Sequence, residues 1–260
     1  MASINNRETL VQVAGDRAAV VEGVRGWLAQ AAQKATAAGR PFHVAVSGGG
    51  QPALLAEVVA SGGDTLALDD WQVWLVDERV VTTESEHSTA AGLADLLAAL
   101  PPGAGHMLDP TVVRAAISAD YAPETLAAVA ASYAAAIEAA LPATDGVPVF
   151  DAILLGLGPD GHTASLFPDS TLLADPAPPI VQYTDCSPKP PPQRVTLSLP
   201  VINAAAAVCF IATGASKADV LPTLVGTSKL PPSPALPASL VAPPAGLTWF
   251  VDEPAAARLV

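Results

Sequence analysis

The feature that most constrains the fold is a set of short apolar segments, each of which runs into glycines or charged residues. They are FHVAV (42–46), WQVWLV (71–76), VFDAILLGLG (149–158) and AAVCFIAT (206–213). Segments with helical periodicity or alanine-rich composition separate them, at residues 52–60, 88–100 and 121–141. Strands that alternate with helices are typical of a parallel sheet covered on both faces. We therefore predict an α/β fold with a Rossmann-like, mostly parallel sheet and helices on both faces.

The rest of the chain adds shorter elements. We expect helices over residues 14–38, 214–225 and 253–259, and strands over 180–184, 194–198 and 247–252. Two proline-rich segments, 168–193 and 231–244, are predicted to be irregular because proline fixes φ and removes a backbone donor. Residues 1–260 are predicted to form a single domain, although a domain boundary within a proline-rich segment is the alternative.

Composition and charge exclude several classes of protein. The 260 residues contain no uninterrupted apolar run of membrane-spanning length, and the polar start of the chain does not resemble a signal peptide. Two cysteines, Cys186 and Cys209, match no metal spacing and cannot build a disulfide framework. The formal net charge of −13, from 12 Lys and Arg against 25 Asp and Glu, argues against nucleic-acid binding. We expect a cytoplasmic protein with no membrane partner.

The acidic composition makes the few cations informative. Between residues 41 and 217 there are five: Arg79, Arg114, Lys189, Arg194 and Lys217. An anionic substrate would take its partners from this set.

Polar clusters follow four of the predicted strands, at residues 47–50, 77–79, 158–162 and 213–217. In open α/β sheets the ligand crevice lies beyond the carboxyl ends of the strands, so these clusters are expected to meet in one site. After the first strand, Ser47, Gly48 and Gly49 can turn backbone N–H groups toward an anion at the start of the next helix. An ordinary strand–helix turn explains the same glycines, and the residues alone leave both interpretations open.

The stretch GLGPDGHTASLFP (156–168) contains one of only four histidines in the chain. His162 titrates near neutral pH and can accept a proton from water, while Asp160 can fix the loop or orient the imidazole. A structural histidine is the alternative. Zinc is disfavoured, because no second histidine or cysteine lies at ligand spacing. Thr163 and Ser165 are interpreted as helix caps.

Arginine and lysine follow the other strands. Arg79 can hold a carbonyl or phosphate oxygen through its planar fork, unless residues 77–79 only mark where the strand surfaces. Lys217 is predicted just inside a helix N-terminus, where a cation is unfavourable unless an anion lies there; a solvated surface lysine is the alternative. Arg194 stands at the start of its strand, so this segment must run in the opposite direction or bend back to reach the others.

Six stretches together resemble the 6-phosphogluconolactonase family. They are VAVSGGGQP, WLVDERVV, GLGPDGHTASLFP, RVTLSLPVINAA, ATGASKADVL and TWFVDEPAA, in this order, within residues 42–256. GLGPDGHTASLFP is the specific one. In the family the glycine loop has Ser-Thr-Pro where this chain has Gly50-Gln51-Pro52, so we expect hydroxyl contacts from positions 50 and 51 to be lost.

The resemblance implies hydrolysis of 6-phospho-D-glucono-1,5-lactone to 6-phosphogluconate, the second step of the oxidative pentose phosphate pathway. It implies no cofactor and no metal, and the fold that the family shares with glucosamine-6-phosphate deaminases. Those deaminases carry Asp-Glu-Tyr where this chain has Arg79 in third place, and a glutamate in the segment after the histidine, which residues 163–168 lack. A deaminase-like enzyme and a non-catalytic sugar-phosphate-binding domain are the alternative functions.

The expected site follows from these considerations. His162 acts as general base on water, with Asp160 and Arg79 as further catalytic residues, Arg79 facing either the oxyanion or the phosphate. The expected substrate contacts are Ser47, Gly48, Gly49, Asp77, Arg194 and Lys217. The only partner expected is a small sugar-phosphate lactone. We expect a monomer, with a dimer as the alternative.

Overall fold

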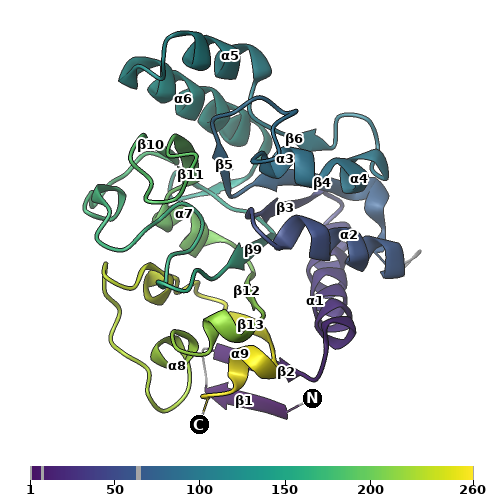
Figure 1. Cartoon of the computed structure of the whole chain (residues 1–260). Helices are drawn as coiled ribbons and strands as arrows, with labels where there is room; N and C mark the ends of the chain where they lie inside the picture. Colours follow the sequence, from purple (N-terminus) through teal and green to yellow (C-terminus); the bar gives the residue numbers. More distant parts are fainter. Residues whose placement is uncertain (1, 7–8, 63–65, 260) are drawn as a thin grey trace.

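The main sheet has eight strands and is parallel except at one edge. A computed structural model of the chain describes residues 2–6, 9–62 and 66–259 (Figure 1). Only the pair at the edge, β1 and β2, is antiparallel, so the predicted mostly parallel sheet is confirmed. In spatial order the strands are β1 (Ala2–Asn6), β2 (Thr9–Ala14), β13 (Leu247–Asp252), β12 (Val208–Ala212), β9 (Ala152–Gly156), β3 (Phe42–Val46), β4 (Trp71–Leu75) and β6 (Gly105–His106).

A smaller antiparallel sheet stands at the carboxyl end of β4. Its strands, in order, are β10 (Val181–Thr184), β11 (Arg194–Leu197) and β5 (Asp77–Arg79). Because β11 runs antiparallel to β5, Arg194 at its start lies opposite Arg79 at the end of β5. The expectation that residues 194–198 run in the opposite direction is confirmed. A two-stranded sheet joins β7 (Ala143–Thr144) to β8 (Val147–Pro148).

The helices largely follow the predicted ones. They are α1 (Arg17–Ala37), α2 (Gln51–Gly62), α3 (Thr89–Gly92), α4 (Ala94–Ala98), α5 (Pro110–Ser118), α6 (Pro123–Ala140), α7 (Leu199–Ala204), α8 (Leu221–Leu224) and α9 (Glu253–Ala256). The predicted helix over 88–100 is divided into α3 and α4 at Leu93. The sequence did not indicate β1, β2 or α5. None of the described helices is long and apolar enough to cross a membrane.

The predicted helix over 214–225 is wrong. The structure has a 3₁₀ turn at Ala215–Lys217 and the single helical turn α8. Pro222 lacks an N–H group, and its ring would meet the carbonyl four residues earlier in a continuous helix. Lys217 therefore lies in a short turn, and the helix-dipole reason given for its placement does not apply.

Two tryptophans of β4 show that helices cover both faces of the sheet. Trp71 and Trp74 are three residues apart in a strand, so their side chains point to opposite faces. The Trp71 Nε1–H group donates to the Leu66 carbonyl, shortly after α2, and Trp74 packs against Tyr133 of α6. Both indoles are fully buried. The predicted two-sided α/β arrangement is confirmed.

The order of the strands places the site. From β3 the chain moves outward to β4 and β6, whereas from β9 it moves the other way to β12 and β13. Because β3 and β9 are neighbours, a topological switch point lies between them, and ligands bind at such points beyond the carboxyl ends. The loops that leave these two strands are Ser47 to Gly50 and Gly156 to His162.

Tyr133 takes the place of a strand partner at the end of β4. Strand β6 ends opposite Trp74, so the next backbone groups on that edge, those of Leu75, lie beyond it. The Leu75 N–H donates to the Tyr133 hydroxyl at 2.7 Å, and this hydroxyl donates to the Leu75 carbonyl at 3.0 Å. Helix α6 is thereby attached to the strand that carries the site.

We expect Tyr133→Phe to lower the free energy of unfolding by about 1–3 kcal/mol, because it leaves buried polar groups of Leu75 unpaired. Urea denaturation measures this loss. Tyr183→Phe is the matched control, since the Tyr183 hydroxyl forms no hydrogen bond within residues 2–6, 9–62 and 66–259. Equal stability of the two variants would contradict the role given to Tyr133.

Candidate active site

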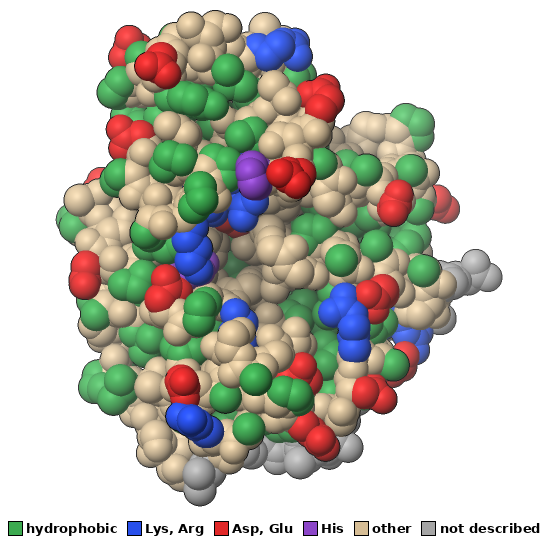
Figure 2. Space-filling view, viewed as in Figure 1, with side chains coloured by type: hydrophobic (Ala, Val, Ile, Leu, Met, Phe, Trp, Pro, Cys, Tyr) green, Lys and Arg blue, Asp and Glu red, His purple; other side chains and the backbone are tan. Residues whose placement is uncertain are grey.

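A cavity of about 410 Å³ opens at the predicted switch point. Figure 2 shows the hollow in the middle of this face, with Lys and Arg side chains along one side of it. Except for Asp160, every predicted site residue lines it, namely Ser47, Gly48, Gly49, Asp77, Arg79, His162, Arg194 and Lys217. Lys189 lines it too, whereas Arg114 lines a separate small cavity near Glu84. Four of the five cations between residues 41 and 217 thus gather in one site.

Asp77 ties together the two loops that form the cavity. Its Oδ1 accepts hydrogen bonds from Ser47 Oγ at 2.6 Å and from the Gly48 N–H at 3.4 Å, and its Oδ2 accepts one from Ser165 Oγ at 2.7 Å. The side chain is buried. Both carboxylate oxygens are therefore occupied by the protein, and Asp77 acts as an anchor for residues 47–49 and the loop after β9.

The next two residues have different tasks. Glu78 is buried and holds the start of α3 by accepting hydrogen bonds from Ser88 and from the N–H groups of Thr89 and Ala90. Burial raises the pKa of Glu78 despite these donors. Arg79 donates from Nη1 to the His87 carbonyl at 2.6 Å, while its buried Nε has no hydrogen-bond partner among the described residues. Its fork therefore retains donors for an anion.

The glycine loop passes close to its neighbours. A Cβ at Gly48 would lie 2.7 Å from Thr89 Oγ1, so only glycine fits there without a shift. Gln51, which replaces the family's hydroxyl residue, is buried and donates from Nε2 to the Ile211 carbonyl at 3.2 Å. It connects the start of α2 to the end of β12. The sequence had not indicated this structural role.

The interpretation of Thr163 and Ser165 as helix caps is wrong. No helix follows them; Thr163 and Leu166 form an isolated backbone bridge within a turn. Thr163 Oγ1 donates to the Gly156 carbonyl, and Ser165 binds Asp77. Both side chains are fully buried, so they fix the loop after β9. Gly158 is required here, because a Cβ would overlap the His162 ring.

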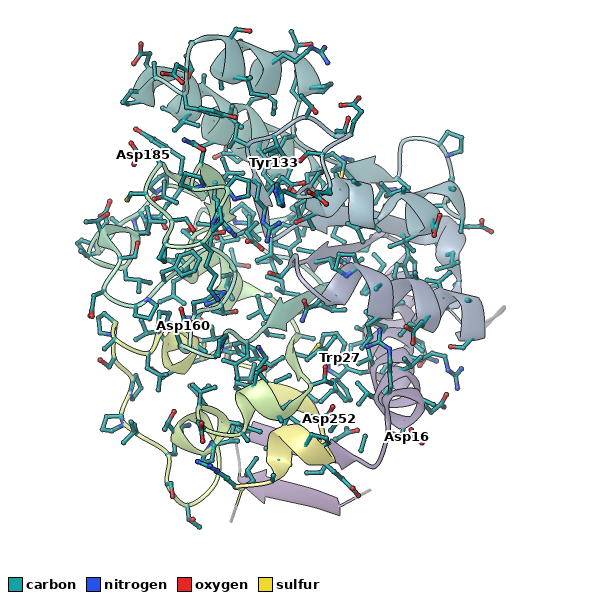
Figure 3. All side chains as sticks on the ribbon, in the orientation of Figure 1. Asp16, Trp27, Tyr133, Asp160, Asp185 and Asp252 are labelled. Carbon is teal, nitrogen blue, oxygen red and sulfur yellow. The ribbon has the colours of Figure 1, made fainter. Side chains whose placement is uncertain are left out.

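His162 and Asp160 are paired at one ring nitrogen. Oδ1 of Asp160 contacts His162 Nδ1 and also accepts from the His162 N–H at 3.3 Å (Asp160 is labelled in Figure 3). Lys189 Nζ lies 3.5 Å from the same Nδ1. With Nδ1 committed to the carboxylate, Nε2 is the nitrogen left for chemistry.

The electrostatic surroundings favour neutral His162. Burial lowers its pKa most, Asp160 opposes this, and the charge of Lys189 lowers it further; the result is a pKa below the ordinary value. Burial acts to raise the pKa of Asp160, but the contact with His162 and the charge of Lys189 outweigh it and lower that pKa. The pair is therefore an ionised carboxylate beside a neutral imidazole at pH 7.

Arg194 and Lys217 are the remaining predicted cations. Arg194 is buried, and its Nε and Nη2 groups donate to backbone carbonyls of the proline-rich loop. Burial, with the nearby charge of Arg79, lowers its pKa. Lys217, which follows β12, also lines the cavity, and burial and the charge of Lys189 lower its pKa. Mutual repulsion among these cations favours an anionic ligand that would neutralise them.

Lys189 is the site residue that sequence reasoning left out. It had been counted among the cations, but it lies in the proline-rich segment that was interpreted as a surface loop. The pairing of β11 with β5 carries that loop to the cavity. Within the described ranges no three His, Cys, Asp or Glu residues lie close enough to hold a metal ion.

Comparisons with known proteins identify the family of the chain. The family model of glucosamine-6-phosphate isomerases/6-phosphogluconolactonase matches residues 15–250. The 6-phosphogluconolactonase of Bos taurus is 41% identical over 229 residues, covering 86% of this chain and 82% of that protein. A crystal structure of 6-phosphogluconolactonase from Leishmania guyanensis is 28% identical, with a TM-score of 0.81, over 95% of this chain and 97% of the other.

A more distant structure shares the fold alone. A monomeric glucosamine-6-phosphate deaminase is 15% identical, with a TM-score of 0.69, over 95% of this chain and 99% of its own.

We expect Asp160→Asn to lower the pKa of His162 further, because the carboxylate raises that pKa by its hydrogen bond and charge. NMR titration of the imidazole protons measures the shift. Asp169→Asn is the matched control, since Asp169 is exposed on the same segment and asparagine tolerates its positive φ. A higher pKa in the Asp160 variant would show that the pair does not interact as described.

Proposed function

The chain belongs to the glucosamine-6-phosphate isomerase/6-phosphogluconolactonase family, and we propose that it hydrolyses 6-phosphogluconolactone with His162 as general base on water. Among its relatives, the 41% identity to a 6-phosphogluconolactonase extends over most of the chain, so it is a lactone hydrolase of that kind. The single observation that carries the mechanism is the pairing of His162 Nδ1 with Asp160 on the wall of a cavity with four cations.

The first step uses the free nitrogen of His162. Nε2 removes a proton from a water molecule as that water attacks the lactone carbonyl carbon. Asp160 holds the ring by Nδ1 and stabilises the imidazolium that forms. A depressed His162 pKa keeps the base unprotonated at neutral pH, which is the form the reaction needs.

The second step releases the ring oxygen. The carbonyl oxygen bears negative charge in the tetrahedral intermediate, and Arg79, which has an unpaired Nε, supplies the electrostatic partner. Collapse of the intermediate breaks the bond from carbon to ring oxygen, and the His162 imidazolium returns its proton to that oxygen. The carboxylic acid produced then ionises and releases one proton to solvent.

The phosphate of the substrate is placed over residues 47–49. Ser47, Gly48 and Gly49 line the cavity at the start of α2. The N–H groups of Ser47 and Gly48 donate to the Leu154 carbonyl and to Asp77, so the Gly49 N–H and the helix end are the groups that favour an anion. Lys217 adds a partly desolvated ammonium, and Arg194 adds its charge from a buried position. Asp77 contributes by holding this loop.

We further propose that residues 1–260 act as one domain, because the cavity takes residues from Ser47 to Lys217 and all the strands that carry them share two adjoining sheets. The acidic exterior is compatible with an anionic substrate because the cations are concentrated inside the site. A cleft lined by charges of one sign focuses the electric field and raises the local concentration of ligands of the opposite charge.

We expect His162→Gln to lower kcat by about 10²–10⁴-fold with little change in KM, because it removes the base and leaves the phosphate contacts. Base consumption in a weakly buffered solution of freshly prepared 6-phosphogluconolactone measures hydrolysis above the spontaneous rate. His87→Gln is the matched control, since the His87 side chain is exposed and does not line the cavity. Unchanged kcat in the His162 variant would remove this residue from the mechanism.

We expect Lys217→Met to raise KM for 6-phosphogluconolactone by about 10–100-fold, equivalent to a lost charged hydrogen bond, with kcat nearly unchanged. Glucono-1,5-lactone without phosphate separates the two roles, because the substitution should leave its hydrolysis nearly unaffected. Lys229→Met, at an exposed position, serves as control. Equal losses with both lactones would place Lys217 at the reacting carbonyl instead of at the phosphate.

A further inference from the structure

The buried side chain of Arg194 holds the proline-rich turn at residues 187–192. Arg194 Nε donates to the Pro191 carbonyl at 3.0 Å, and Arg194 Nη2 donates to the Lys189 carbonyl at 3.0 Å. Prolines at 190, 191 and 192 carry no N–H group, so the turn has few backbone donors of its own. The guanidinium replaces these missing donors, and residues 187–192 keep a defined shape without a strand partner.

Two of the three guanidinium nitrogens of Arg194, Nε and Nη2, are therefore directed to the protein. Besides these carbonyl contacts, its guanidinium carbon stands 5.7 Å from the centre of the Phe167 ring. The side chain is only 4% exposed. Lys217, by contrast, forms no side-chain hydrogen bond within the described ranges and presents its charge to the cavity. A direct phosphate ligand would present its donors to the cavity as Lys217 does, whereas Arg194 directs Nε and Nη2 to loop carbonyls.

The turn that Arg194 holds places Lys189 beside His162, the proposed base. Ser187 Oγ donates to the Lys189 carbonyl at 3.0 Å, which also accepts from Arg194, so the backbone of Lys189 is fixed from two sides. Its ammonium nitrogen then lies 3.5 Å from His162 Nδ1 and within the influence of Asp160. Figure 3 shows Asp185, near the start of this loop, and Asp160 on the same side of the molecule.

We propose that Arg194 is a positioning residue, which fixes the turn at residues 187–192 so that the Lys189 ammonium stands beside Asp160 and His162 Nδ1. Lys189 in turn opposes protonation of His162 and keeps it ready to accept a proton. The consequence for catalysis rests on the proposed role of His162 as base. The placement of Lys189 by the turn does not depend on that role.

The charges around His162 determine the sign of the effect. Asp160 contacts Nδ1, Lys189 lies beside the same atom, Asp77 acts from across the cavity, and the Phe167 ring packs 4.5 Å away. The two carboxylates raise the pKa of His162, whereas Lys189 lowers it. Loss or displacement of Lys189 therefore raises the pKa of His162. As the pH falls, His162 is then protonated, and can no longer act as a base, at a higher pH than in the unaltered enzyme.

NMR titration of His162 in the free enzyme tests the geometry without any substrate. Lys189→Met removes the cation, and Arg194→Lys keeps a positive charge but cannot bridge the carbonyls with a planar fork. We expect both substitutions to move the His162 midpoint to higher pH. Lys229→Met should leave it unchanged, and the spectrum of His162→Gln assigns the signal among the four histidines.

Two results would overturn the proposal. An unchanged midpoint in Lys189→Met would show that the ammonium does not act on His162. An unchanged midpoint in a folded Arg194→Lys would show that Arg194 does not act through the turn. Because Arg194 is buried, Ser187→Ala provides a milder variant that loosens the same carbonyl; it should shift the midpoint in the same direction, and its failure to do so would also count against the proposal.

Kinetics then separate positioning from phosphate binding. If Arg194 acts through Lys189, the acid limb of the pH profile of kcat/KM moves to higher pH in both Lys189→Met and Arg194→Lys. The variant that combines the two substitutions should then have a kcat/KM within about twofold of that of the more affected single variant. Effects that multiply, with a raised KM and an unmoved acid limb, would make Arg194 a direct phosphate ligand. Failure of the proposed function can be distinguished from failure of this inference. An active His162→Gln would contradict the proposed mechanism, whereas the NMR titration would still test the role of the turn.

Discussion

The site depends on one buried carboxylate, that of Asp77. Strands β3 and β9 bring two loops to the same edge of the sheet, but adjacency of strands does not fix the distance between their loops. Asp77 does so by accepting from Ser47 and Gly48 on one side and from Ser165 on the other. A charged acceptor binds such donors more strongly than a neutral one, and its desolvation is compensated only while all of them are present. The loop at residues 47–49 and the loop after β9 are therefore positioned as a unit.

A second constraint is the concentration of cations in an acidic protein. Arg79, Lys189, Arg194 and Lys217 repel one another across the cavity, and burial adds to the cost, as the lowered pKa values of Arg194 and Lys217 show. The protein offsets part of this cost by different means: a carbonyl for Arg79, loop carbonyls for Arg194, and the carboxylate of Asp160 near the two lysines. What remains uncompensated is available to an anionic ligand, and the proposed phosphate-binding residues are in this sense electrostatically preorganised.

The sequence predicted the part of the fold that depends on local pattern, and much less of what depends on tertiary contacts. The apolar segments ending at Val46 and Gly156 were recognisable as strands, and the glycines after them marked the crevice. Strand β2, which lies between the edge strand β1 and β13, carries a weak alternation and was not recognised, and Pro222 interrupts the continuous helix that composition had favoured over residues 214–225. Lys189 was not predicted as a site residue because a proline-rich segment gives no signal of where it packs. Its location follows only from the register of β11 against β5.

The same register explains why His162 and its electrostatic partner Lys189 come from distant parts of the chain. Strand β5 leaves the main sheet after β4, and β11 returns antiparallel to it, so Arg194 is placed opposite Arg79 with the loop that precedes it over the cavity. A parallel return would have put the start of that strand at the far edge, and the loop away from His162. The small sheet therefore does more than extend the fold. It makes a proline-rich connection, which has few backbone donors, into a wall of the site that Arg194 and Ser187 hold in shape.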